Sequence, residues 1–160
     1  MDEKIAALQD YLEREKEIIL AYLFGSQVGG RPGPLSDYDL GILVRSPSLD
    51  LWTRLGHGLG AVLNTERVDV VLMNWAPIEL TYAIIAQGRL LYQRSVAERV
   101  EFEAKVLSLY ADYLPILRRQ REEILKDGAR ETRVQRYREA LGRTERTLAA
   151  IRTAQGKAPG

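Results

Sequence analysis

The stretch IILAYLFGSQVGGRPGPLSDYDLGILV, residues 18–44, decides the fold. It holds two apolar runs, 18–24 and 40–44, each suited to a buried strand and too short to span a membrane. The first run stops at Gly25, and a connection rich in Gly and Pro leads to Asp37 and Asp39. The stretch therefore predicts two strands joined by a loop, with two acids where the second strand begins.

Asp37 and Asp39 are predicted to lie on one face of the second strand, because strand side chains alternate between faces. Tyr38 then points to the other face. Two carboxylates held this close repel each other, and a fold keeps such a pair when the two share a proton or when a divalent cation neutralises them. We expect the cation, and Mg²⁺ in particular, since carboxylates and substrate phosphates are its usual ligands.

Gly25 and Ser26 form the turn that ends the first strand, and both suit a phosphate ligand. Glycine lets the backbone approach a ligand closely, exposed turn amides can hold phosphate oxygens, and the serine hydroxyl adds a donor. Phosphates at this turn and a metal at Asp37 and Asp39 together predict a nucleotide site.

A third acid, Asp69, lies within the predicted strand 67–73. A charged side chain in a buried strand is rare unless it is paired or bound to metal. If this strand lies beside the second one, Asp69 joins the first two acids around one or two cations. The alternative is an ion pair with Arg67 or Arg45.

The pair Gly25-Ser26, followed by ten residues and then Asp37-x-Asp39, resembles the signature of the DNA polymerase beta type nucleotidyltransferase superfamily. Within it the chain is most similar to the minimal nucleotidyltransferases, the MntA-type adenylyltransferase antitoxins that partner HEPN toxins. The resemblance covers roughly residues 1–120. It implies an α+β fold, in which a small mixed β-sheet core is flanked by helices and followed by a C-terminal helical extension.

The resemblance also implies an activity, the Mg²⁺-dependent transfer of AMP from ATP to a hydroxyl of the HEPN toxin, with a tyrosine as the expected acceptor. Asp37 and Asp39 would bridge two cations about 3.5–4 Å apart. Asp69 would bind the metal nearer the acceptor and accept the proton of the hydroxyl. These three acids are therefore the candidate metal ligands and catalytic residues.

The loop after the first strand supplies the candidate nucleotide-binding residues. The Gly25 amide and the Ser26 hydroxyl would hold the β- and γ-phosphates. Arg31 either adds positive charge to the phosphates or is a solvated loop residue. The loop segment 27–34, QVGGRPGP, replaces the Ala-Arg-Gly pattern expected after Gly-Ser, which bears on the phosphate contacts and the rate.

The rest of the first 121 residues predicts helices around the sheet. Helical spacing of apolar residues indicates helices over 2–16, 51–63, 78–87 and 100–121, and 89–92 is predicted as a short strand. In 51–63 the glycines lower the helix propensity, and the expected apolar stripe is Leu51, Leu55, Leu59 and Val62. In 100–121, which Pro115 can kink, the expected stripe is Val106, Leu107, Tyr110, Tyr113, Leu114 and Leu117.

The C-terminal part predicts a further helix with a coiled-coil-like seam, which steps by three and four residues over 134–151. This seam either packs on its own chain or forms a partner surface, including one for a homo- or hetero-oligomer. We expect a core domain over 1–95 and C-terminal helices over 96–160.

Three ring-bearing residues outside the motifs are expected to be structural. His57, the one histidine, is predicted as a packing or surface residue rather than a catalyst. Trp52 and Trp75 are predicted as core or interface aromatics, and the alternative is stacking on a base.

Composition limits the class of protein. The chain has no cysteine, so a disulfide framework is excluded, and its charged N-terminus is unlike a signal peptide. We expect a soluble cytoplasmic protein. Residues 1–114 carry 11 basic and 16 acidic side chains, whereas residues 115–160 carry 12 and 6. The basic tail suggests an acidic protein or nucleic acid partner, although a solvated helix face explains it equally well.

Two functional hypotheses of different classes follow. The first is an enzyme that adenylylates a HEPN toxin and so neutralises it. The second is an antitoxin that binds the toxin stoichiometrically and no longer uses its acids. Transfer of AMP to a small molecule such as an aminoglycoside is a third option, but that substrate usually needs a larger accessory domain.

Overall fold

The computed structural model describes residues 2–28, 37–128, 142–143, 146–147 and 149–152. The chain divides into two compact units, Met1–Asp112 and Tyr113–Gly160. In order, the elements are α1 (Asp2–Arg14), β1 (Ile18–Phe24), η1 (Gly25–Gln27), β2 (Tyr38–Val44), α2 (Leu49–Leu63), β3 (Val68–Leu72), α3 (Ile78–Gln87), β4 (Arg89–Gln93) and α4 (Val96–Gly128).

The four strands form one mixed sheet in the order β3-β2-β1-β4. β1 pairs antiparallel with β2 and with β4, whereas β2 and β3 run parallel. The predicted mixed sheet and α+β class are therefore confirmed. β3 lies directly beside β2, which is the arrangement that Asp69 needs to join Asp37 and Asp39.

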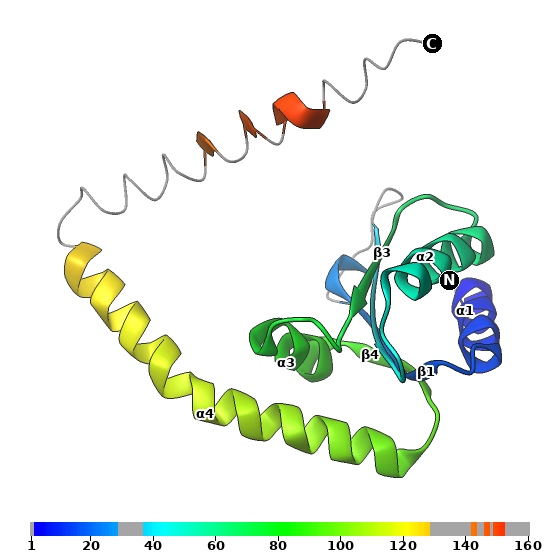
Figure 1. Cartoon of the computed structure of the whole chain (residues 1–160), viewed down its shortest axis with the longest axis horizontal. Helices are drawn as coiled ribbons and strands as arrows, with labels where there is room; N and C mark the ends of the chain where they lie inside the picture. Colours follow the sequence, from blue (N-terminus) through cyan, green and yellow to red (C-terminus); the bar gives the residue numbers. More distant parts are fainter. Residues whose placement is uncertain (1, 29–36, 129–141, 144–145, 148, 153–160) are drawn as a thin grey trace. The chain divides into compact units, whose positions relative to one another are not determined.

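Helices cover both faces of the sheet. α1 and α2 lie on one face and α3 on the other (Figure 1). The larger apolar cluster joins α1 and α2 to alternate strand residues such as Leu40, Ile42 and Val70. The smaller cluster joins Leu43, Met73 and other residues of the opposite face to α3 and α4. The sheet is thus a buried layer between helices, and the ends of its strands remain available to form a site.

The helix α2 begins and ends at recognisable caps. The Ser48 hydroxyl accepts a hydrogen bond from the Leu51 amide at 3.1 Å, and Asn64 ends the helix in the left-handed conformation with a φ of 52°. Gly58, which lowers helix propensity, lets the Tyr11 side chain of α1 lie close to α2, because a Cβ there would lie 2.0 Å from the Tyr11 hydroxyl oxygen. One detail of the predicted stripe is wrong. Its last fully buried member is Leu63, which completes the 3.6-residue repeat, and not Val62.

The helix α4 begins four residues earlier than predicted. Ser95 lies directly before the helix and its hydroxyl accepts a hydrogen bond from the Glu98 amide at 3.2 Å, so Ser-x-x-Glu acts as an N-terminal cap. Arg94 binds the Glu98 carboxylate, and chiefly this contact lowers the pKa of Glu98 to about 2. Leu107 is wrongly assigned to the buried stripe, since it is 49% exposed.

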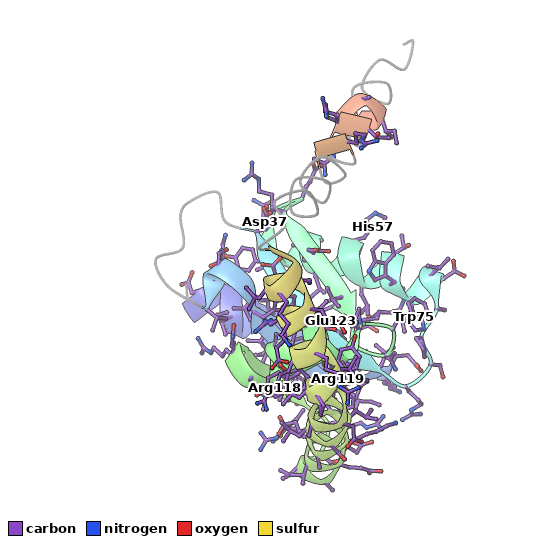
Figure 2. All side chains as sticks on the ribbon, turned by 90° about the vertical axis from the view of Figure 1, so that its left-hand side faces the viewer. Asp37, His57, Trp75, Arg118, Arg119 and Glu123 are labelled. Carbon is purple, nitrogen blue, oxygen red and sulfur yellow. The ribbon has the colours of Figure 1, made fainter. Side chains whose placement is uncertain are left out.

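The second unit carries the later part of α4, which continues through Pro115 to Gly128. The side chains of Arg118, Arg119 and Glu123 on this part are labelled in Figure 2, and all are exposed.

The predicted seam over 134–151 falls almost entirely outside the described residues and stays a prediction, as does the domain boundary after residue 95. Among the described residues, none of the helices is long and apolar enough to cross a membrane.

Candidate active site

Asp39 and Asp69 lie side by side in neighbouring parallel strands. Asp39 of β2 is the register partner of Asp69 of β3, and register partners point to the same face of a sheet. Asp37 stands two residues before Asp39, immediately ahead of β2 (Figure 2). The structure thus brings the three predicted acids to one end of two adjacent strands.

Gly25 places the turn after β1 against Asp39. It begins the short 3-10 helix η1 and has a φ of +73°, a conformation that side chains disfavour. A Cβ on Gly25 would lie 2.0 Å from Oδ2 of Asp39. The contact follows from the strand pairing, because Asp39 is the register partner of Phe24, the last residue of β1. Backbone conformation and available space therefore both require glycine here.

The environment of Asp39 disfavours its ionised form. Burial raises the pKa of Asp39 most, and the negative charges of Asp69 and Asp37 raise it further. None of the three acids forms an ion pair within the described ranges, whose ion pairs lie at Arg54–Glu15, Arg94–Glu98 and Arg99–Glu103. Within the described ranges, the negative charge of the three acids is therefore not compensated by an ion pair.

The donor set fits a hard divalent cation. Carboxylate oxygens are the ligands that Mg²⁺ prefers, and a bound cation would reverse the repulsion that raises the pKa of Asp39. As the side chains stand, no three His, Cys, Asp or Glu groups among the described residues are gathered closely enough to hold a metal ion. The strand register brings the acids together, but complete coordination also requires side-chain adjustment and oxygens from a substrate.

The remaining predicted site residues lie on the same turn or outside the described part of the chain. Ser26 is exposed within η1, directly after Gly25. Its role as a phosphate donor stays a prediction. Arg31 lies outside the described residues. No ion pair between Asp69 and Arg45 is formed, since the described ion pairs are those named above.

A groove of about 840 Å³ runs along β3 and reaches Asp69. Its other wall is α2, which contributes Trp52, Gly56, His57 and Gly60. Trp52 is 43% exposed, and its indole N–H donates to the Val70 carbonyl at 2.7 Å. The expectation of core packing does not hold for Trp52, nor for Trp75, which is 53% exposed. The exposed His57 agrees with its predicted surface position (Figure 2).

The sequence did not reveal this groove, because it depends on β3 being an edge strand. Strand order is a tertiary property, and alternation along 68–72 looks the same for an edge strand and a central one. The small residues of α2 that form the wall, Gly56, Gly60 and Ala61, were a signal that could have been used.

Residues 6–97 match the family described as polymerase beta nucleotidyltransferase. No match was found among curated proteins. Among solved structures, a chain in the complex of the tri-AMPylated Shewanella oneidensis HEPN toxin with MNT antitoxin is 23% identical, with a TM-score of 0.55, over 71% of this chain and 92% of that chain.

Two further solved structures are similar. A chain of a toxin-antitoxin crystallised with AMP-PNP is 24% identical, with a TM-score of 0.60, over 71% of this chain and 94% of that chain. A chain of the MntA-HepT toxin-antitoxin is 22% identical, with a TM-score of 0.57, over 73% and 96%. At these identities the likeness shows a shared fold.

Proposed function

Because the chain belongs to the polymerase beta nucleotidyltransferase family, we propose that it transfers AMP from ATP to a hydroxyl of a HEPN toxin and thereby acts as its antitoxin. One observation carries the proposal. The Asp39 carboxylate lies in register with Asp69 on one side and against the backbone of Gly25 on the other. This arrangement supports a site in which the acids would bind the metal and the Gly25 turn would bind the phosphates.

Asp37, Asp39 and Asp69 would hold the divalent cations, two Mg²⁺ ions in our proposal. When bound, these ions would polarise the α-phosphate and neutralise charge on the departing pyrophosphate. The Gly25 turn presents backbone close to Asp39, and the exposed Ser26 hydroxyl adds a donor for the β- and γ-phosphates. ATP would then lie with its phosphates between the turn and the acids.

In our proposal, Asp69 takes the acceptor's proton. It lies on the edge strand, with the groove along β3 on its open side. In the proposed reaction the acceptor oxygen forms a bond to the α-phosphorus, and the bond from that phosphorus to the oxygen bridging the α- and β-phosphates breaks. Pyrophosphate leaves with the electron pair, and the hydroxyl proton passes to the Asp69 carboxylate.

The choice of acceptor follows the structural neighbours. One of them is a complex with an AMPylated HEPN toxin, and another contains the ATP analogue AMP-PNP. By that analogy we propose that a tyrosine hydroxyl of a HEPN toxin is the acceptor and that the reaction takes place in the cytoplasm.

The test is to incubate the protein with ATP labelled on the α-phosphate, Mg²⁺ and the HEPN protein encoded beside its gene. We expect label on the HEPN protein, and loss of that label in Asp39→Ala. Glu101→Ala, which removes an exposed acid of α4, is the matched control and should leave the transfer intact. An unlabelled but inhibited HEPN protein would show stoichiometric binding and contradict the transferase proposal.

A further inference from the structure

β3 exposes backbone hydrogen-bonding groups on its outer side. In a parallel pair, alternate residues direct their amide and carbonyl toward the neighbouring strand. The Met73 amide donates to the Ile42 carbonyl, and the Arg67 carbonyl accepts from the Tyr38 amide, so the odd-numbered residues of this segment face β2. The backbone groups that face the outer edge are those of Val68, Val70 and Leu72.

Only part of this outer edge is occupied. The Val70 carbonyl accepts from the indole of Trp52, and the Leu72 carbonyl accepts from the turn amides that follow β3. Within the described residues, the Val68 carbonyl and the Val70 amide have no hydrogen-bond partner. This acceptor and this donor flank Asp69, and in a parallel ladder they are the two groups that bind one residue of an added strand.

The position of that added residue is therefore defined. It would be the register partner of Asp69 on the outer side, as Asp39 is on the inner side. Adjacent strands lie about 4.8 Å apart, and register partners share a face of the sheet. A hydroxyl side chain at this position would project beside the Asp69 carboxylate, on the face that carries Asp39.

The groove has room for such a strand, with a volume of about 840 Å³ along β3. Its far wall is lined by small residues of α2, and a Cβ at Gly56 would meet nothing within 4 Å. Glu66 and Asp69 line the end nearest the site. Their charges favour a segment with basic residues beside its hydroxyl residue.

We propose that an extended segment of the acceptor protein adds as a parallel strand to the outer edge of β3, with its hydroxyl residue opposite Asp69. This inference rests on the proposed function, and it specifies how the acceptor is held. Strand addition supplies affinity through the main chain and leaves side-chain pockets to set specificity. Trp52 then marks the end of the binding edge, because its indole occupies the Val70 carbonyl that a longer strand would use.

Gly56 allows a test that separates docking from folding. Gly56→Trp fills the groove from a helix position at which a Cβ would meet open space. With the HEPN protein as acceptor, we expect Gly56→Trp to raise its KM by about tenfold or more, with kcat and the KM for ATP within about twofold of wild type. Glu101→Trp, which adds the same side chain at an exposed position of α4 outside the groove, is the control and should behave as wild type. An unchanged acceptor KM in Gly56→Trp overturns the proposal.

A second measurement does not depend on catalysis. Backbone amide exchange is followed in the transfer-deficient Asp39→Asn variant with and without the HEPN protein. We expect slower exchange at the Val70 amide on binding, and loss of that protection when Gly56→Trp is added. Binding without protection of Val70 overturns the docking mode even if AMP is transferred. Protection in the absence of any AMP transfer by the wild type would support docking and refute the proposed transferase function.

Discussion

Gly25 and Asp39 constrain each other closely. The glycine has a φ of +73°, and a Cβ would lie 2.0 Å from the Asp39 Oδ2. Packing a carboxylate against backbone in this way partly buries it, and this burial is the main reason for the raised pKa of Asp39. The arrangement costs stability when Asp39 is ionised, and in the proposed site a bound cation would offset that cost.

Gly25→Ala should therefore reduce both stability and nucleotide binding. We expect the free energy of unfolding to fall by about 1–2 kcal/mol, because alanine disfavours a positive φ. The methyl group should also displace Asp39 and weaken Mg²⁺-dependent ATP binding. Urea denaturation and calorimetry measure the two effects. Gly56→Ala is the control and should gain up to about 1 kcal/mol, because its helical Cβ meets open space.

Asp39→Asn should raise the melting temperature of the metal-free protein at pH 7 while reducing AMP transfer by about 1,000-fold. A carboxyl whose pKa is raised by folding binds its proton more tightly in the folded state. Stability is then lost as pH rises from the ordinary pKa of 3.8 toward the folded value. The melting temperatures of wild type and variant should thus diverge between pH 4 and pH 7, as measured by thermal scans.

Magnesium supplies the control for Asp39→Asn. Added Mg²⁺ with ATP should raise the melting temperature of the wild type and leave that of the variant almost unchanged, since a ligand stabilises only the state that binds it. A wild type that is as stable as Asp39→Asn across this pH range would argue against repulsion among the three acids.

Among the elements, α3 and α4 hold the sheet face on which Asp39 and Asp69 lie. Gly41 of β2 lets α3 approach closely, since a Cβ there would lie 2.8 Å from the Cγ2 atom of Ile84. The Tyr22 hydroxyl of β1 donates to the Glu103 carboxylate of α4 at 2.5 Å. Tyr82 of α3 stacks on Tyr110 of α4, with ring centroids 3.8 Å apart. These contacts hold α3 and α4 against the sheet face that carries Asp39 and Asp69.

Glu103→Gln tests the link between β1 and α4. We expect a loss of about 1–2 kcal/mol in the free energy of unfolding, because a hydrogen bond to a charged acceptor becomes a neutral one. Burial, followed by the Glu103 hydrogen bond, raises the pKa of Tyr22 above its ordinary value of 10.0. Wild-type stability should therefore fall as pH rises above 10, and the variant should lose less in that range. Urea denaturation at pH 7 and at pH 10.5 measures both effects. Equal alkaline losses would contradict the assignment.

At the scale of the whole molecule, both apolar clusters and all the described site residues lie in the unit Met1–Asp112. The smaller cluster includes Phe102, and Val106 is 3% exposed, so the first part of α4 belongs to this core. The later part of α4 exposes Ile116, Ile124 and Leu125. The first unit therefore holds the apolar core of the described residues, whereas the later part of α4 leaves apolar side chains exposed.

Truncation tests this division. A chain ending at residue 112 should unfold cooperatively and bind ATP with Mg²⁺ within about twofold of the full chain, because it retains both clusters. A chain ending at residue 95 should be markedly less stable, since it lacks Phe102, Glu103 and Val106. Thermal unfolding and calorimetry compare the two. Equal stability of the two truncated chains would instead favour the predicted domain boundary after residue 95.

The sequence by itself determined the elements and the identity of the three acids. Apolar runs are local, so the strands β1 and β2 could be recognised without the fold. The Ser95 cap was equally local but was overlooked, which shifted the predicted start of α4.

Only the tertiary structure decided which residues lie next to the three acids. Strand order placed Asp69 beside Asp39, made β3 an edge and opened the groove along it. It also put the Gly25 backbone against the Asp39 carboxylate. The physical reason is that periodicity specifies which face a side chain takes, whereas neighbours across a sheet come from pairing between distant segments, which no local pattern specifies.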